Sequence, residues 1–214
     1  MKVGLISDTH GYLPRLPLID ALLHAGDIGV DRDPVRWYRD EFHPWAKDQG
    51  VPIFATFGNH DRIGERLQIP DNAPSNLRYV TDELIDVLGV PVWFSPWSLR
   101  YGDWAWMATE PTLGKKYAKI PCVTRVIVTH GPPLNFGDRN LQGGRCGSEA
   151  LRRRMRELPA LQLVVCGHIH EARGTYGLMR SDQPLIEVQN VSHVNEWYEP
   201  IHPITVIDWP PVQP

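Results

Sequence analysis

Five short apolar runs, each too short for a helix, constrain most strongly what this chain can fold into. The runs are rich in Val, Ile, Leu and Phe and cover residues 3–7, 22–25, 51–57, 123–129 and 161–166. Continuous apolar runs of this length are typical of strands that are buried on both faces. We therefore predict that these five segments form the central strands of a layered fold.

Polar stretches with helical character, residues 34–49 and 148–158, lie between some of these runs. Alternation of strands and helices indicates an α/β architecture. The segments 77–107 and 175–209 hold short β-like runs broken by glycine and proline, so we expect additional antiparallel strands there. We find no internal repeat, low-complexity tract or linker, and we expect one domain, 1–214, with two packed sheets.

Composition argues against several classes of protein. The net charge of −3 at pH 7 argues against binding of duplex nucleic acid, and the cluster Arg152-Arg153-Arg154 is typical of a solvated helix face. The three cysteines are too widely spaced for a disulfide framework and form no CxxC pair for zinc, which indicates a reducing compartment. With no long apolar segment and no signal-peptide pattern, we expect a cytoplasmic protein without membrane contact.

Residues of the kinds that bind metal ions follow each of the five apolar runs. The five segments are Asp8-Thr9-His10, Gly26-Asp27, Gly58-Asn59-His60-Asp61, His130-Gly131-Pro132-Pro133 and Gly167-His168-Ile169-His170. Loops at the carboxyl ends of strands in α/β folds converge on one crevice, so these segments can meet in space. Carboxylate oxygen and imidazole nitrogen together suit divalent first-row metals. The pattern therefore predicts a metal centre, and a carboxylate such as Asp27 could bridge two ions.

Each segment taken alone also has a structural interpretation. Asp8 could cap a helix, and Gly26-Asp27 is a common turn. Asn59 and Asp61 also favour turns, and His130 could simply end a strand. The pair His168 and His170 would lie on one face of a strand, which helps chelation and also occurs by chance. The occurrence of all five segments in this order, each after a predicted strand, favours the metal centre.

In this order the motifs resemble the calcineurin-like metallophosphoesterase superfamily, whose pattern is DxH, GD, GNH[DE], H and GHxH. The resemblance spans residues 8 to 170. It implies an α/β fold with two mixed β-sheets packed as a sandwich flanked by helices, and a dinuclear metal centre. It implies that one ion is held by Asp8, His10, Asp27 and His170. The other ion would be held by Asp27, Asn59, His130 and His168.

A closer resemblance is to the metallophosphoesterase-domain-containing subgroup of phosphodiesterases, which includes brain-expressed mammalian members. It rests on residues 23–28, 94–97, 129–134, 167–171, 190–192 and 198–200. Some members lack a histidine at the position of His168, whereas this chain keeps it, so full metal binding is expected. The arginine motif GDxVDRG of the superfamily's protein phosphatases is not matched here, because the stretch 26–33 has an extra residue and no final glycine. Protein dephosphorylation is therefore disfavoured.

The resemblance implies hydrolysis of a phosphodiester, such as a cyclic nucleotide or a small nucleotide-like diester. Two divalent ions, manganese or else iron or zinc, would activate water. The expected catalytic residues are His60, as proton donor to the leaving oxygen, and Asp61, as the residue that orients it. Glu171 and Asp138 are candidate acceptors for the second ring N–H of ligand histidines, or else surface charges.

Candidate substrate contacts are Asn59, His60, Asn135 and Arg139. Trp97 and Phe136 could stack on a base, although ordinary burial explains them better. Three alternative functions remain open at this point: a phosphomonoesterase, a nuclease acting on single strands, and a metal-binding scaffold of the kind found in the retromer complex. The expected partner is a small phosphodiester or nucleotide, and the sequence leaves the oligomeric state undetermined.

Overall fold

The computed structural model describes residues 1–180 and 183–211, and it places a strand within each of the five apolar runs. These strands are β1 (Lys2–Ile6), β2 (Ala21–His24), β3 (Ile53–Ala55), β9 (Val126–Thr129) and β10 (Leu163–Cys166). Their side chains alternate between two cores, as β1 shows: Val3 and Leu5 face one core and Ile6 faces another. Burial on both faces explains why these strands are apolar throughout.

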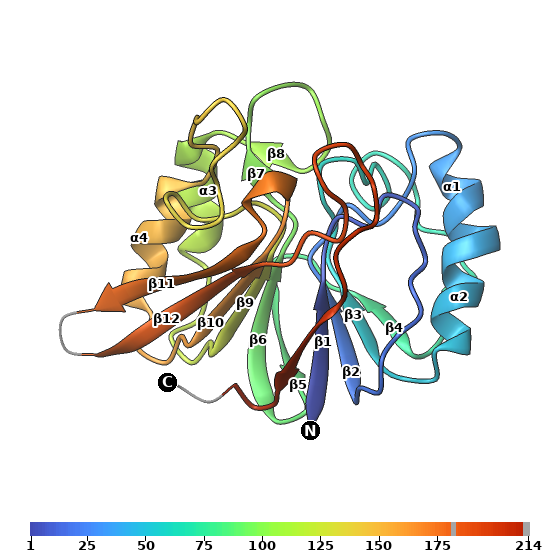
Figure 1. Cartoon of the computed structure of the whole chain (residues 1–214), viewed down its shortest axis with the longest axis horizontal. Helices are drawn as coiled ribbons and strands as arrows, with labels where there is room; N and C mark the ends of the chain where they lie inside the picture. Colours follow the sequence, from blue (N-terminus) through green and yellow to red (C-terminus); the bar gives the residue numbers. More distant parts are fainter. Residues whose placement is uncertain (181–182, 212–214) are drawn as a thin grey trace.

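Two mixed sheets contain most of the strands (Figure 1). The first has the order β13-β1-β2-β3-β4 and the second β11-β12-β10-β9-β6-β5. The added strands are β4 (Leu77–Tyr79), β5 (Glu83–Val87), β6 (Val90–Ser95), β11 (Gly174–Arg180), β12 (Gln183–Asn190) and β13 (Thr205–Asp208). A small parallel pair consists of β7 (Ser98–Leu99) and β8 (Met107–Ala108).

Among the described strands, the expectation of additional antiparallel strands is correct for β5, β6, β11, β12 and β13 and wrong for β4 and for the pair β7 and β8. Strands β5, β11 and β13 pair antiparallel with a neighbour. Strands β4, β6 and β12 also pair parallel, with β3, β9 and β10 respectively. The connections between these parallel partners are long enough to return the chain to the same end of the sheet, which parallel pairing requires.

Helices cover the outer face of each sheet (Figure 1). On the first sheet, α1 (Pro34–Trp37), a π-helical segment (Tyr38–Phe42) and α2 (His43–Asp48) pack through Tyr38, Phe42 and Ala46. On the second, α3 (Glu110–Tyr117) and α4 (Glu149–Glu157) pack through Leu113, Leu151 and Met155. A short 3-10 helix, η2, spans His170–Ala172. None of the described helices is long and apolar enough to cross a membrane.

The core between the sheets joins the two halves of the molecule. Val3 and Leu5 of the first sheet belong to the same buried cluster as Val126, Val128 and Val165 of the second. The predicted class, a sandwich of two mixed β-sheets flanked by helices, is confirmed. This packing brings the carboxyl ends of the parallel strands in both sheets to one edge of the sandwich.

Candidate metal centre

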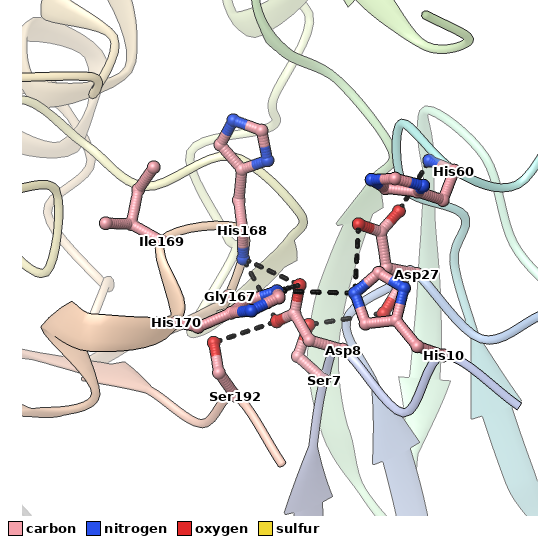
Figure 2. Close-up of polar contacts among 12 residues, drawn as sticks. Ser7, Asp8, His10, Asp27, His60, Gly167, His168, Ile169, His170 and Ser192 are labelled. Atoms are coloured by element: carbon pink, nitrogen blue, oxygen red, sulfur yellow. Dashed lines mark hydrogen bonds and ion pairs between the residues drawn. The ribbon is translucent and has the colours of Figure 1, made fainter. Parts of the chain in front are cut away.

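The polar residues that follow the five central strands lie together at this edge. Figure 2 shows those that follow β1, β2, β3 and β10. The loop after β1 supplies Asp8 and His10, and the loop after β2 supplies Asp27. Residues from the second sheet reach the same place, because His168 and His170 follow β10. The predicted ligands therefore converge in space, although 162 positions separate Asp8 from His170.

Two groups of side chains have donor atoms that lie within 4.8 Å of one another: Asp8 with His10 and His170, and Asp27 with His130 and His168. A third group of the same kind joins His10, Asp27 and His60. Asn59 belongs beside the second group, because its Oδ1 atom lies 2.9 Å from Nε2 of His130. The first two groups match the division of ligands between two ions that the sequence resemblance implies.

Close backbone approach explains two of the glycines in the motifs. A side chain at Gly167 would overlap the carboxylate of Asp8 and the side chain of Ser7, and one at Gly58 would overlap Asp27. Strain is concentrated here as well, since Asp8 and His168 both have positive φ, 54° and 70°. Such conformations are unfavourable for residues other than glycine and cluster at functional sites.

The carboxylate of Asp8 ties the two sheets together. Both of its oxygens accept from the backbone N–H of His168, at 3.1 and 3.0 Å, and Oδ2 also accepts from Oγ of Ser192 at 2.9 Å (Figure 2). Burial opposes ionisation, but the neighbouring His170 outweighs it and lowers the pKa of Asp8 below its usual range. Asp8 is therefore an ionised, fixed carboxylate.

Backbone carbonyls set the orientation of two histidines. Nδ1 of His130 lies 3.1 Å from the carbonyl oxygen of Ala25, and Nδ1 of His170 lies 3.1 Å from that of Asn195. A carbonyl oxygen only accepts, so each Nδ1 carries a proton and each Nε2 points into the site. Nε2 of His130 then faces Oδ2 of Asp27 at 3.3 Å in addition to the amide oxygen of Asn59.

The acceptor atoms of Asp27, Asn59 and His130 repel one another, and a cation between them relieves this repulsion. Burial lowers the pKa of His130, but the charge of Asp27 overrides this effect and raises it to about 9, so a proton fills that role without metal. Burial lowers the pKa of His10 to about 4 and that of His168 to about 3, which leaves both rings neutral near pH 7. Neutral imidazole and ionised carboxylate are the forms that bind divalent metals, so the donor set fits two such ions.

His60 lies at the edge of the centre, on the side of His10. Its backbone N–H donates to Oδ1 of Asp27 at 2.8 Å, and its ring meets that of His10 edge-on with the centroids 4.9 Å apart. The ring also lies 4.6 Å from that of Trp104, between centroids, and Nδ1 lies 3.5 Å from Oδ2 of Asp31. His60 is thus held close to the predicted ligands with a carboxylate beside its ring.

The expectation that Asp61 orients His60 is wrong. The buried carboxylate of Asp61 accepts from the backbone N–H groups of Ile28, Gly29 and Gly58 and from the hydroxyl of Tyr38 at 2.8 Å. Neighbouring residues in this turn point in different directions. Asp61 holds the loops after β2 and β3 through their backbone N–H groups, and Asp31 contacts the ring of His60. Sequence reasoning missed Asp31, which stands four positions after Asp27 in a stretch considered only for its arginine.

Glu171 and Asp138 do not accept from the ligand histidines, so the first of the two interpretations given for them is wrong. Oε1 of Glu171 accepts from the backbone N–H of Leu141, and the buried Asp138 accepts from Asn135 and Arg145. Both carboxylates therefore order a loop, and backbone carbonyls are the acceptors for His130 and His170. A carbonyl contact of this kind leaves no signal in the sequence.

Of the four residues expected to contact substrate, the structure places two at the metal centre and two away from it. Asn59 and His60 lie at the centre, whereas Asn135 and Arg139 are exposed on the loop that follows His130. Trp97 and Phe136 pack against the core under α3 and α4, as ordinary burial predicts. Two aromatic residues that the sequence did not place at the site flank the ligands, although one of them, Tyr198, lies in a segment that carries the resemblance. The ring of Tyr198 lies 4.7 Å from that of His10, and the ring of Tyr101 lies 5.7 Å from that of His168, between centroids.

Comparisons with known proteins agree with this arrangement. Metallophosphoesterase domain-containing protein 1 of Homo sapiens is 27% identical over 239 aligned residues, which cover 96% of this chain and 70% of that protein. A UPF0046 protein of Caenorhabditis elegans is 31% identical over 137 residues, which cover 61% of this chain and 35% of that protein. The crystal structure of a dimetal phosphatase from Danio rerio has the same fold, with a TM-score of 0.53, 12% identity and coverage of 96% and 91%.

The family model for calcineurin-like phosphoesterases matches residues 1–172. This span contains all five predicted ligand segments, from Asp8 to His170, and the strands that hold them. The resemblance read from the motifs is therefore confirmed, and the chain belongs to the calcineurin-like phosphoesterase family.

Proposed function

We propose that this protein is a dinuclear metal-dependent phosphodiesterase. The observation that supports this most directly is the position of Asp27, whose carboxylate lies 3.7 Å from Nε2 of His10 and 3.3 Å from Nε2 of His130. It thus stands between the two ligand groups, where a carboxylate can serve both ions. Mixed nitrogen and oxygen donors accept manganese, iron or zinc, and we favour manganese.

Asp8, His10 and His170 would hold one ion with Asp27, and Asn59, His130 and His168 would hold the other. When bound, two such ions neutralise the charge of a phosphate and lower the pKa of water so that hydroxide is available near neutral pH. The protein contributes the fixed positions of the donors. Hydrogen bonds to Asp8 and backbone acceptors for His130 and His170 hold these side chains in place before any substrate arrives.

His60 is the residue that we propose to act on the leaving group. In hydrolysis the oxygen of water forms a new bond to phosphorus, and the bond from phosphorus to the leaving oxygen breaks. That oxygen departs with the electron pair and takes a proton from the imidazole of His60, giving an alcohol and a phosphomonoester. The attacking water releases a proton to solvent, and solvent returns a proton to His60. Asp31, beside Nδ1 of His60, would keep the ring oriented with Nε2 toward the substrate.

The preference for a diester rests on the resemblance to the phosphodiesterase subgroup and on charge. A monoester dianion needs more positive charge around its free oxygens than a diester monoanion does, and the arginine motif of the protein phosphatases is not matched here. The Danio rerio protein of the same fold is described as a phosphatase, so monoester hydrolysis is the competing function. A small nucleotide-like diester is the substrate that we propose.

The test compares bis(4-nitrophenyl) phosphate with 4-nitrophenyl phosphate, using protein loaded with manganese and the same metal concentration throughout. We expect a higher kcat/KM for the diester, and no hydrolysis of either by the Asp27→Ala variant. A clear advantage for the monoester would replace the diester proposal by a phosphomonoesterase. A metal-loaded protein that hydrolyses neither ester would favour a binding or scaffold function.

A further inference from the structure

A cavity of about 390 Å³ opens beside the metal centre on the side of His168. The lining includes Arg100 and Tyr101 from the loop after β7, and Asn140 and Arg145 from the loop after His130. The ring of His168 forms part of the lining, so a molecule in the cavity would touch the site where the phosphate is proposed to bind. Cavities of this size accommodate small ligands or parts of them.

Arg145 is held in place by a buried carboxylate. Its Nη1 atom donates to Oδ1 of Asp138 at 2.8 Å, and Asp138 is fully buried. Oδ2 of Asp138 accepts from the backbone N–H groups of Asn135 and Gly147, so its position is set by the loop itself. The side chain of Arg145 is 44% exposed, and only its Nη1 atom contacts Asp138, so its other N–H groups can donate to a ligand.

The loop that carries Arg145, residues 131–147, is held next to the metal centre by hydrogen bonds. Its two ends pair with each other, since the backbone N–H of Ser148 donates to Pro132 and that of Leu134 donates to Ser148. Its outer part is held by Glu171, which accepts from the backbone N–H of Leu141 and follows His170 directly. The distance between Arg145 and the metal centre is therefore fixed by the fold.

The charged groups that line the cavity are cationic. Arg100 donates to the carbonyl oxygen of Met107 at 3.2 Å, a neutral partner that leaves its charge uncompensated. Among the described residues, no carboxylate lines the cavity. The phenol of Tyr101 also lines the cavity and offers an O–H donor. Two guanidinium groups and a phenol O–H around one cavity favour an anion.

The side of the centre on which the cavity lies indicates which part of a substrate would enter it. In Figure 2 His60, the proposed proton donor to the leaving group, lies beside Asp27 and His10, and His168 lies across the site from it. With the leaving oxygen at His60, the other ester group of the same phosphate points toward His168 and the cavity beside it. The cavity would thus receive the part of the substrate that stays on phosphorus.

We propose that Arg100 and Arg145 form a subsite for a second negatively charged group, a phosphate or a carboxylate, on the retained ester group of the substrate. This inference rests on the proposed function and makes its substrate class more specific. The preferred substrate is then a phosphodiester that carries a further anionic group. The product is a phosphomonoester that keeps that group.

The experiment uses three diesters that all release 4-nitrophenolate and differ in the retained group: phenyl, 4-carboxyphenyl and 4-phosphonophenyl. Because the leaving group is constant, the contribution of His60 cancels in the ratio of kcat/KM values. We expect wild type to prefer the two charged substrates, and Arg100→Gln and Arg145→Gln to reduce that preference by about 10- to 100-fold, as expected for a charged hydrogen bond. The larger of the two preferences identifies the anion as carboxylate or phosphate.

Arg78→Gln is the matched control, because it removes an arginine that is paired with Glu83 on the surface and leaves the cavity intact. It should keep the wild-type preference. Higher salt should weaken the preference of wild type and leave the phenyl substrate unaffected. Equal preference in wild type and in both cavity variants, with the phenyl substrate still hydrolysed, would overturn the subsite and leave the proposed function standing.

A binding measurement covers the case in which no ester is hydrolysed, which would contradict the proposed function. Calorimetric titration of the metal-loaded protein compares phenylphosphonate with 4-carboxyphenylphosphonate. We expect tighter binding of the carboxylated compound by wild type and by Arg78→Gln, and loss of the difference in Arg100→Gln and Arg145→Gln. Equal affinities in wild type would overturn the subsite independently of any activity.

Discussion

Oδ2 of Asp31 lies 3.5 Å from Nδ1 of His60, although these residues follow different strands of the first sheet. Asp31 is largely exposed and His60 is largely buried, so the carboxylate faces the ring from the solvent side. A carboxylate in this position favours one orientation of the ring, with Nδ1 toward Asp31 and Nε2 away from it. Of the two acidic residues near His60, Asp31 contacts its ring, whereas Asp61 holds the surrounding loops.

His60→Ala should harm hydrolysis of a nucleotide diester more than hydrolysis of an aryl diester. An aryl oxide leaves readily without a proton, whereas a ribose alkoxide is strongly basic and needs one. General acid catalysis typically contributes about 10²- to 10⁴-fold, and that factor should appear mainly with the nucleotide substrate. The measurement is kcat/KM for both substrates and metal content on one preparation. Equal losses for the two substrates, or loss of metal, would remove His60 from the acid role.

Asp31→Asn should cause a smaller loss with the same dependence on the leaving group. The amide keeps the size of the side chain but loses the charge that faces His60. Substitution of such supporting residues typically lowers activity by about 10- to 100-fold. We expect that loss for the nucleotide diester, and metal content and thermal stability at the wild-type level. A variant that retains full activity on both substrates would show that the contact has no function in catalysis.

Asp61→Ala should lower stability and activity together. It removes the acceptor for three backbone N–H groups and the hydroxyl of Tyr38 in a fully buried place. Leaving several buried donors unpaired should lower the free energy of unfolding by about 3 kcal/mol or more. Denaturant unfolding of the metal-free protein measures this directly. If Asp61→Ala keeps wild-type stability and loses kcat/KM only for substrates with basic leaving groups, Asp61 orients His60 as first expected.

Asp27→Ala should affect both ions, and His10→Ala only one. Metal analysis after loading with manganese should approach two ions per chain for wild type and about one for His10→Ala, if Asp27 bridges the pair. Asp27→Ala should lose metal from both groups, since its carboxylate faces His10 and His130. A firm stoichiometry of one ion in wild type would contradict the dinuclear centre.

Metal affinity should rise with pH between about 6.5 and about 9, because the proton on His130 must leave before a metal can bind. For the metal-free protein, a pKa raised by Asp27 means stabilisation that is present below pH 6.5 and is lost as pH rises through about 9. At acid pH, His10 and His168 change stability in the opposite direction. Burial lowers their pKa values to about 4 and about 3 in the folded protein. The unfolded chain therefore binds protons more readily below pH 6.5, and the free energy of unfolding falls there.

Melting temperatures at a series of pH values, with and without manganese, check this prediction. The metal-free protein should lose stability on both sides of about pH 6.5, and the loss toward alkaline pH should disappear when metal is bound. Titration calorimetry in buffers with different ionisation enthalpies should detect the released proton. Metal affinity that does not change between pH 6.5 and 9 would contradict the assignment to His130.

The central strands and the convergence of seven polar residues could be predicted from the sequence, because strands buried on both faces are apolar throughout and parallel strands end at one edge. Helix α3 was missed, since Pro111 and Gly114 obscure its helical pattern. Asp31 and Tyr198 were missed for another reason. The direction of a side chain in a loop depends on the packing of distant segments, such as the tail that brings Tyr198 against His10.

The division of the predicted ligands between the two sheets has a mechanical consequence. Asp8, His10, Asp27 and Asn59 follow strands of the first sheet, while His130, His168 and His170 follow strands of the second. A pair of bound ions would therefore act as a cross-link at the open edge of the sandwich. Any slip of one sheet against the other would move the three ligands of the second sheet relative to the four of the first. The affinity for metal would then report on the alignment of the whole fold.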